Sequence, residues 1–157
     1  MAVIAGFMVP HPPLIVPEIG KGEENGIRET TEGYEKAAAE IAALKPETIV
    51  VISPHSVMYA DYFHVSPGKE AAGDFRQFRA GQVALQAEYD ETFVRCLCRE
   101  AQEAGFPLGT LGEREKRLDH GVMVPLYFVN KYLQGCRLVR IGLSGLSKAE
   151  HYRAGML

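Results

Sequence analysis

The sequence predicts an α/β fold with a mostly parallel sheet, on three observations. Residues 48–53 read Thr-Ile-Val-Val-Ile-Ser, a β-branched run typical of a strand buried on both faces of a parallel sheet. Apolar residues recur with helical spacing at residues 34–44 and 93–104, on either side of that run. The length of 157 residues suits one domain with a sizeable core.

The first third of the chain is predicted as a strand, a stiff loop and a helix. Residues 2–9 are an apolar run of strand length that Pro10 stops. Four prolines between residues 10 and 17 restrict the backbone φ angles of the loop. The helix follows a turn signal at residues 25–26 and is closed by Pro46.

After the strand at residues 48–53, a short strand at residues 62–66 and an exposed loop at residues 69–81 are predicted. Asp90 is a suitable N-cap for the next helix, which ends at Gly105.

The last third begins with a charged, turn-rich loop and continues with a helix over residues 122–133. Pro125 is tolerable in that helix only within its first turn. Residues 137–143 are predicted as a strand, and a capping-box pattern at Ser147 opens a final helix. The chain ends at Leu157 with no strand after that helix, so we expect residues 1–157 to be the N-terminal portion of one longer α/β domain, truncated at its C-terminus.

Composition narrows the class of partner. The net charge of −3 comes with no concentrated basic face, which argues against nucleic acid. No apolar segment approaches the roughly 20 residues of a membrane span, and the N-terminus lacks a signal-peptide pattern, so we expect a cytoplasmic protein with no membrane partner. A truncated sheet edge would invite pairing, which makes a homodimer one expected assembly.

Three histidines carry the strongest functional signal, since each lies where a strand or loop meets a Pro- or Gly-marked turn: His11, His55 and His120. Ligands of α/β domains bind at strand ends, and imidazole both ligates metals and exchanges protons near neutral pH. A right-handed crossover would bring His11 and His55 to one edge of the sheet. As purely structural residues, both would instead hydrogen-bond to nearby loop backbone.

His120 lies directly after Asp119, near the start of the helix predicted over residues 122–133. The helix N-terminus would lower the pKa of the imidazole, and the charge of Asp119 would oppose that shift. A neutral His120 could accept a proton, so Asp119 and His120 are the candidate catalytic residues. The structural alternative makes Asp119 the N-cap and His120 a first-turn residue.

The motifs around these histidines are Met8-Val9-Pro10-His11-Pro12-Pro13-Leu14, Ile52-Ser53-Pro54-His55, and Leu118-Asp119-His120-Gly121 with Pro125-Leu126. Together and in this order they resemble the class III extradiol ring-cleavage dioxygenases, catalytic B-subunit superfamily, in the branch of AmmeMemoRadiSam-associated and Memo-like proteins. The resemblance spans nearly the whole chain.

The resemblance implies a three-layer α/β/α sandwich and an oxidoreductase that cleaves a catechol-type aromatic diol with O2. It implies a non-haem Fe(II) ion, with His11 and His55 as metal ligands and His120 as the acid/base group. A site with two histidines and one carboxylate leaves positions open for the diol and O2. The carboxylate ligand of the family is a glutamate that would lie beyond residue 157, and nothing in this chain matches it.

Two other functions stay open. A Memo-like metal-binding or partner-binding module would bind metal through His11 and His55 without ring cleavage. A hydrolase would use Zn²⁺ on the same histidines, because neutral imidazoles serve zinc equally well.

Overall fold

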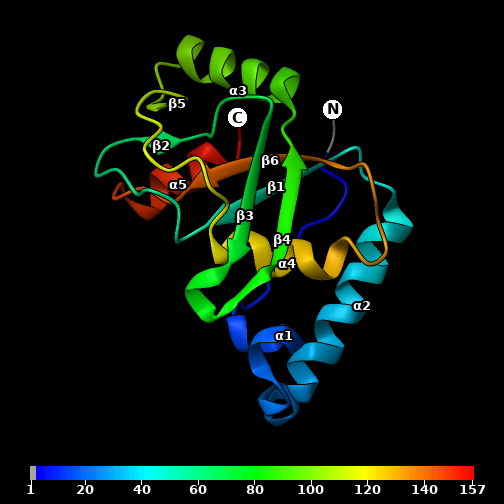
Figure 1. Ribbon diagram of the computed structural model, residues 1–157. Coiled ribbons are helices and arrows are strands. Elements are labelled where there is room, and N and C mark those ends of the chain that lie inside the picture. The colour runs from blue at the N-terminus through cyan, green and yellow to red at the C-terminus, as the bar shows by residue number, and fades with distance from the viewer. Residues whose placement is uncertain (1–2) are drawn as a thin grey trace.

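The computed structural model describes residues 3–157 and confirms the predicted α/β fold. Its six strands pair as three two-stranded ladders, two of them parallel (Figure 1). The parallel ladders are β1 (Thr48–Ser53) with β6 (Arg137–Gly142) and β2 (Phe63–His64) with β5 (Leu108–Gly109). Strands β3 (Glu70–Phe75) and β4 (Ala80–Glu88) form an antiparallel hairpin. Isolated bridges join Val65 to Ile141 and Tyr89 to Leu138, which links the ladders through β6.

The described residues also form five α-helices and three 3-10 turns. The helices are α1 (Pro17–Gly20), α2 (Arg28–Leu44), α3 (Glu91–Glu103), α4 (His120–Val129) and α5 (Lys148–Ala154). The 3-10 turns are η1 (Pro13–Ile15), η2 (Glu23–Ile27) and η3 (Arg76–Phe78). Within residues 3–157, each helix is too short or too polar to cross a bilayer.

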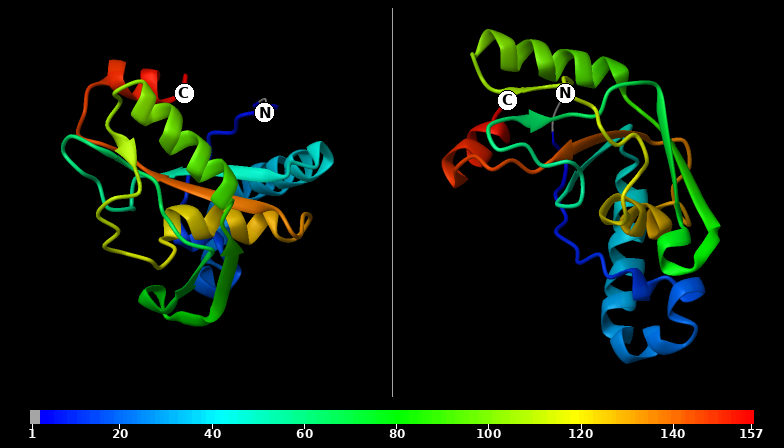
Figure 2. Two further views of the ribbon diagram at one scale, coloured as in Figure 1. Left: turned by 90° about the horizontal axis from the view of Figure 1, so that it is seen from above. Right: turned by 60° about the vertical axis from the view of Figure 1, so that its left-hand side comes forward.

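The hydrophobic core lies on both sides of β6. Leu138 faces the larger cluster, which includes α4, α2 and the β3–β4 hairpin. Val139, the next residue, faces a smaller cluster with α3 and β5. Figure 2 shows α3 and α4 on different sides of β6, so helices cover both faces of this strand.

Strand β1 forms where predicted, but the expectation that both of its faces are buried is wrong. Ile49 and Val51 pack against the larger cluster, whereas Val50 and Ile52 are 43% and 60% exposed. The β-branched composition shows strand propensity, but burial depends on which elements pack above the strand. Among the described residues, none covers the outer face of β1.

The predicted strand over residues 2–9 is also wrong where it can be compared; residue 2 lies outside the described residues. Residues 3–9 have no regular secondary structure, and Val3 and Met8 are 95% and 100% exposed. A strand needs a neighbour for its backbone N–H and C=O groups. The described part of the chain provides no such ladder for this segment.

The expected loop at residues 69–81 is instead the β3–β4 hairpin, closed by η3. Val83, Leu85 and Ala87 of β4 pack against the larger cluster, while the residues between them face outward. This alternation with period two is the strand signal that the sequence reading missed. The short strand β5 was not predicted either.

The predicted helix caps are confirmed, and one helix boundary is corrected. The side chain of Asp90 accepts a hydrogen bond from the Phe93 N–H, and that of Ser147 accepts one from Glu150 N–H. Helix α4 begins at His120, two residues earlier than predicted, because Asp119 caps it. Pro125 therefore lies inside the helix and not in its first turn.

Candidate metal centre

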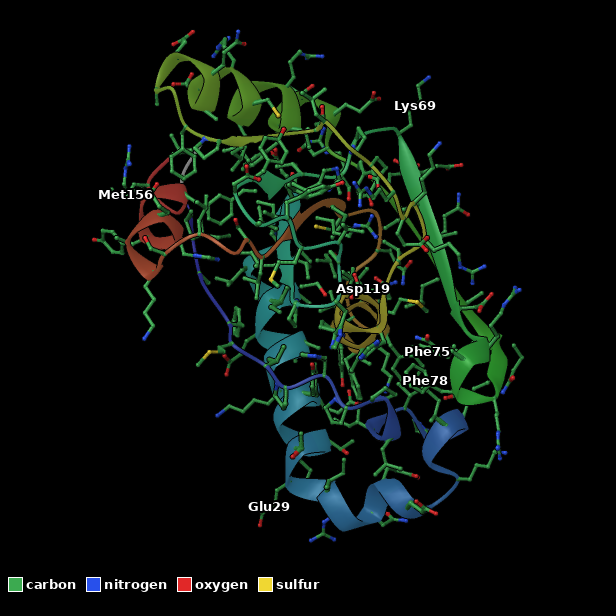
Figure 3. The ribbon with its side chains drawn as sticks, turned by 90° about the vertical axis from the view of Figure 1, so that its left-hand side faces the viewer. Glu29, Lys69, Phe75, Phe78, Asp119 and Met156 are labelled. Carbon is green, nitrogen blue, oxygen red and sulfur yellow. The ribbon has the colours of Figure 1, made fainter. Side chains whose placement is uncertain are left out.

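Three separate turns present the three histidines. His11 lies in the proline-rich loop, which is fastened to α2 by a hydrogen bond from the Tyr34 hydroxyl to the carbonyl of Pro10. His55 lies two residues beyond the end of β1, and His120 is the first residue of α4. Figure 3 shows Asp119 at the start of α4, with Phe78 at the tip of the β3–β4 hairpin.

The structure brings the three imidazoles together. The Nε2 atoms of His11 and His55 are 2.8 Å apart. The ring centroids of His55 and His120 are separated by 3.9 Å, and those of His11 and His120 by 5.7 Å. One nitrogen from each ring lies within 4.8 Å of the other two, so the set could hold a metal ion.

The contact between His11 and His55 suits a shared cation. Two nitrogen ligands about 2.1 Å from one ion, at a right angle, would be about 3 Å apart, close to the separation found here. A hydrogen bond between the two nitrogens would require one of them to carry a proton. A cation between them would instead use the lone pairs of two neutral rings.

Asp119 is held by hydroxyl groups from the end of β1 and the turn that follows it. Ser53 Oγ donates to Oδ1 at 2.5 Å, and Ser56 Oγ donates to Oδ2 at 2.9 Å. The N–H of Val122 also donates to Oδ1, at 3.3 Å, as expected of an N-cap. These bonds occupy both carboxylate oxygens, so Asp119 fixes the turn that carries His120.

Residues 5–156 of this chain match the sequence model of the LigB family, which is described as the catalytic LigB subunit of aromatic ring-opening dioxygenase. The chain belongs to this family. The match confirms the superfamily that the three histidine motifs indicated, and it includes all three histidines.

Two relatives have longer chains than this LigB-family chain. It is 37% identical to Protein CA_C1420 of Clostridium acetobutylicum, over 99% of this chain and 35% of that protein. It is 24% identical to the 2-aminophenol 1,6-dioxygenase beta subunit of a Pseudomonas species, over 81% of this chain and 44% of that subunit. The chain thus spans less than half the length of either relative.

Gly121 of the LigB-family chain allows the two turns to approach each other. A Cβ at this position would lie 2.5 Å from Ser53 Oγ and 3.1 Å from Cδ2 of His55. Atoms this close overlap, so any side chain at residue 121 would push the His55 and His120 turns apart. Glycine is required here because the two turns lie so close together. Backbone conformation does not require it, since its φ is not positive.

The pKa of the His120 imidazole lies below its usual value. Burial is the largest cause, and the charge of His55 lowers the pKa further. Asp119 raises it, and the charge of His11 has the smallest effect, which lowers it. The predicted opposition from Asp119 is found, but the main cause is burial and not the helix N-terminus. The ring of Phe78 contacts His120 edge to face, with centroids 5.3 Å apart.

The other carboxylates that lie near the motifs in sequence point elsewhere. Glu18 accepts a hydrogen bond from the Tyr127 hydroxyl at 3.1 Å, and Glu113 pairs with Arg140 at 3.5 Å. Neither joins the histidine cluster among the described residues. Sequence reasoning overlooked the roles of Ser53, Ser56 and Phe78, whose contacts arise only in the folded chain.

Proposed function

We propose that this chain supplies the metal-binding and proton-transfer groups of a non-haem Fe(II) extradiol dioxygenase, which opens a catechol-type aromatic ring with O2. The observation that carries the proposal is the 2.8 Å approach of the His11 and His55 nitrogens, with His120 beside them. The family supports the reaction class. The name of the Pseudomonas relative supports an aromatic substrate with adjacent hydroxyl or amino groups.

His11 and His55 would hold the ion. Imidazole suits Fe²⁺ and also Zn²⁺, so the donor set fits either metal. When bound, ferrous iron would supply the chemistry that activates O2 beside a chelated diol. The two histidines orient the site because they come from turns whose backbones are fixed by prolines and by β1.

His120 would take a proton from a substrate hydroxyl and later return it to the opening ring. Its lowered pKa keeps the imidazole neutral, and a neutral ring can accept a proton. Asp119 would act through the backbone, by capping α4 and so holding His120 next to the metal ligands. Phe78 makes the surroundings of His120 apolar on one side of the ring.

The resemblance implies a glutamate as the third ligand, and the described histidine cluster includes no carboxylate. We therefore propose metal binding for this chain and ring opening for a site that a carboxylate completes. Metal binding and ring opening therefore need separate measurements.

The test measures metal binding and oxygen use separately. Anaerobic titration with Fe²⁺ and Zn²⁺ should show binding that is lost in His11→Ala and His55→Ala. In protein whose site a carboxylate completes, oxygen uptake with catechol and 2-aminophenol should require Fe²⁺ and should fall in His120→Ala. Binding without uptake would favour the metal-binding module, and zinc-dependent ester or amide hydrolysis would favour the hydrolase. If no metal binds, the proposal is wrong.

A further inference from the structure

Ser53 occupies the point where the two functional turns meet. It is the last residue of β1 and is fully buried. Its Oγ donates to Asp119 Oδ1 at 2.5 Å and accepts the backbone N–H of His55 at 3.1 Å. One hydroxyl thus bonds both to the turn that carries His55 and to the turn that carries His120.

We propose that Ser53 is a positioning residue that couples the metal-ligand turn of His55 to the proton-transfer turn of Asp119 and His120. This inference rests on the proposed function for the roles of the histidines. It goes beyond that function, because it assigns the relative geometry of the two turns to one side chain.

The chemistry of a hydroxyl explains why serine suits this position. A hydroxyl carries one proton to donate and lone pairs with which to accept. The bond to the Asp119 carboxylate is charge-assisted, so it is the stronger of the two. Alanine at residue 53 would leave the partly buried N–H of His55 without this acceptor and would remove one donor from Asp119.

The space around the hydroxyl leaves few alternatives. A Cβ on Gly121 would lie 2.5 Å from Ser53 Oγ and 3.0 Å from Asp119 Oδ1. The absent side chain of residue 121 is therefore what lets the hydroxyl reach both turns. The two residues act as a pair: a small donor on β1 and no side chain opposite it on α4.

The chain offers two matched controls. Ser56 Oγ donates to the other oxygen of Asp119 at 2.9 Å but makes no bond to His55. Ser66 is also buried and accepts from Arg140 Nε at 2.7 Å, away from the histidines. Ser56→Ala removes one bond to Asp119 and leaves the bond between Ser53 and His55 in place. Ser66→Ala removes a buried serine hydroxyl that lies away from the histidines.

The first measurement uses metal-free protein labelled with ¹⁵N at histidine. Ser53→Ala should shift the ring signals of both His55 and His120 and should speed the exchange of the His55 amide. Ser56→Ala should shift the His120 signal alone, and Ser66→Ala should shift neither. Unchanged His55 signals in Ser53→Ala would overturn the inference.

The second measurement is the affinity for Co²⁺, a spectroscopic probe of the same histidines. Loss of a group that orients a ligand typically weakens metal binding about 10- to 100-fold, so Ser53→Ala should raise the Kd about tenfold. The two control variants should change it less than about threefold. Equal effects of Ser53→Ala and Ser56→Ala on the Kd would also contradict the coupling.

These measurements separate the inference from the proposed function. If the unmodified chain binds no Co²⁺, the proposed function fails, and the ring signals still decide whether Ser53 couples the turns. Melting temperatures of the three variants provide the stability control. Ser66→Ala should lower the melting temperature at least as much as Ser53→Ala, since it loses a bond to a guanidinium.

Discussion

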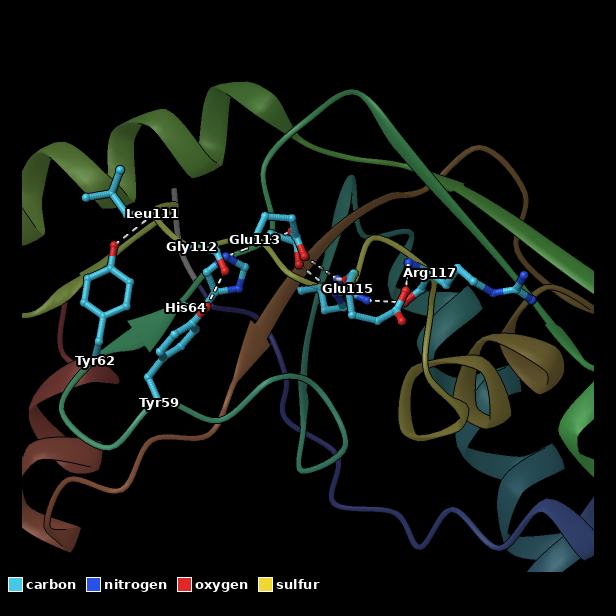
Figure 4. Close-up of polar contacts among 10 residues, drawn as sticks. Tyr59, Tyr62, His64, Leu111, Gly112, Glu113, Glu115 and Arg117 are labelled. Atoms are coloured by element: carbon cyan, nitrogen blue, oxygen red, sulfur yellow. Dashed lines mark hydrogen bonds and ion pairs between the residues drawn. The ribbon is translucent and has the colours of Figure 1, made fainter.

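Two polar clusters in this molecule contain a histidine and differ in how their polar atoms are satisfied. The histidine cluster consists of His11, His55 and His120, whose rings face one another. The buried ion cluster consists of His64, Glu113 and Arg140. Figure 4 shows His64 next to Glu113, which lies on the loop that leads to α4. In the histidine cluster the ring nitrogens approach other ring nitrogens. In the buried ion cluster Arg140 is hydrogen-bonded through all of its guanidinium nitrogens, whereas His64 Nε2 lies 4.0 Å from Glu113 and makes no hydrogen bond to any described residue.

Arg140 shows how fully the buried ion cluster is bonded. It is 3% exposed, and its guanidinium donates to the carbonyls of Arg117 and Glu115, each at 2.6 Å. It also donates to Ser66 Oγ and pairs with Glu113. Figure 4 shows Glu113, Glu115 and Arg117 along this loop.

The difference between the two clusters distinguishes groups that can bind a ligand from groups that stabilise the fold. A buried charge is tolerated when its hydrogen-bonding capacity is satisfied, and such a group holds the chain together. Nitrogens that face one another with lone pairs available have capacity left for a ligand. We therefore propose a binding role for the histidine cluster and a stabilising role for the buried ion cluster, and four predictions test this division.

The largest expected effect is on catalysis. In protein whose site a carboxylate completes, His120→Ala should lower kcat for ring opening by about 10²–10⁴-fold, because it removes the proposed acid/base group. The affinity for Fe²⁺ should change little, since His11 and His55 remain. Steady-state oxygen uptake and an anaerobic metal titration on the same variant check both values, and a large loss of metal affinity would make His120 a ligand.

The next effect is on stability. Arg140→Met should lower the free energy of unfolding by about 3–5 kcal/mol, because Glu113 would be left buried without its partner. Urea denaturation measures this change. Arg28→Gln is the control on the surface: Arg28 Nε lies 3.3 Å from Glu32 Oε1 and both side chains are exposed, so its loss should cost about 0–1 kcal/mol. Equal losses of unfolding free energy in the two variants would contradict a stabilising role for the buried ion cluster.

A smaller effect is expected when one metal ligand is lost. His55→Ala should weaken Zn²⁺ binding more than the roughly 10- to 100-fold typical of an orienting residue. Because the His55 ring is exposed, the melting temperature of the metal-free variant should stay close to that of the unmodified chain. His64→Gln should show the reverse pattern, with normal Zn²⁺ affinity and lower stability.

The smallest effect concerns pH. Burial lowers the pKa of His64, with Glu113 opposing and Arg140 adding to the shift. The unfolded chain binds its proton near the usual pKa of about 6.5, so between the two pKa values it holds more protons than the folded chain. His64 therefore contributes full stability above about pH 6.5 and loses it as the pH falls through this window.

Denaturation curves at about pH 7.5 and about pH 5.5 test this sign. The free energy of unfolding should fall less between these two values in His64→Gln than in the unmodified chain. His120 also has a lowered pKa, but it is present in both proteins, so its contribution cancels in the difference. An equal fall in both proteins would remove His64 as a source of the pH dependence.

Much of the local structure could be predicted because its causes are local. Strand β1 follows from β-branched residues, and α3 follows from a capping aspartate and helical spacing. The β3–β4 hairpin was not predicted, because many of its residues are polar or small. The alternation of Val83, Leu85 and Ala87 is the feature that indicates a strand there. The segment at residues 3–9 shows the opposite error, since apolar residues alone do not provide a pairing partner.

By itself, the sequence determined the α/β class, the family motifs and the three histidines at turns, because propensity, caps and motifs are written in neighbouring residues. Only the tertiary structure decided that His11 and His55 meet at 2.8 Å, that both oxygens of Asp119 are taken up by serines, and that the outer face of β1 is open. These are contacts between segments far apart in the chain. Their distances depend on how β1 and α4 pack, and no local pattern contains that information.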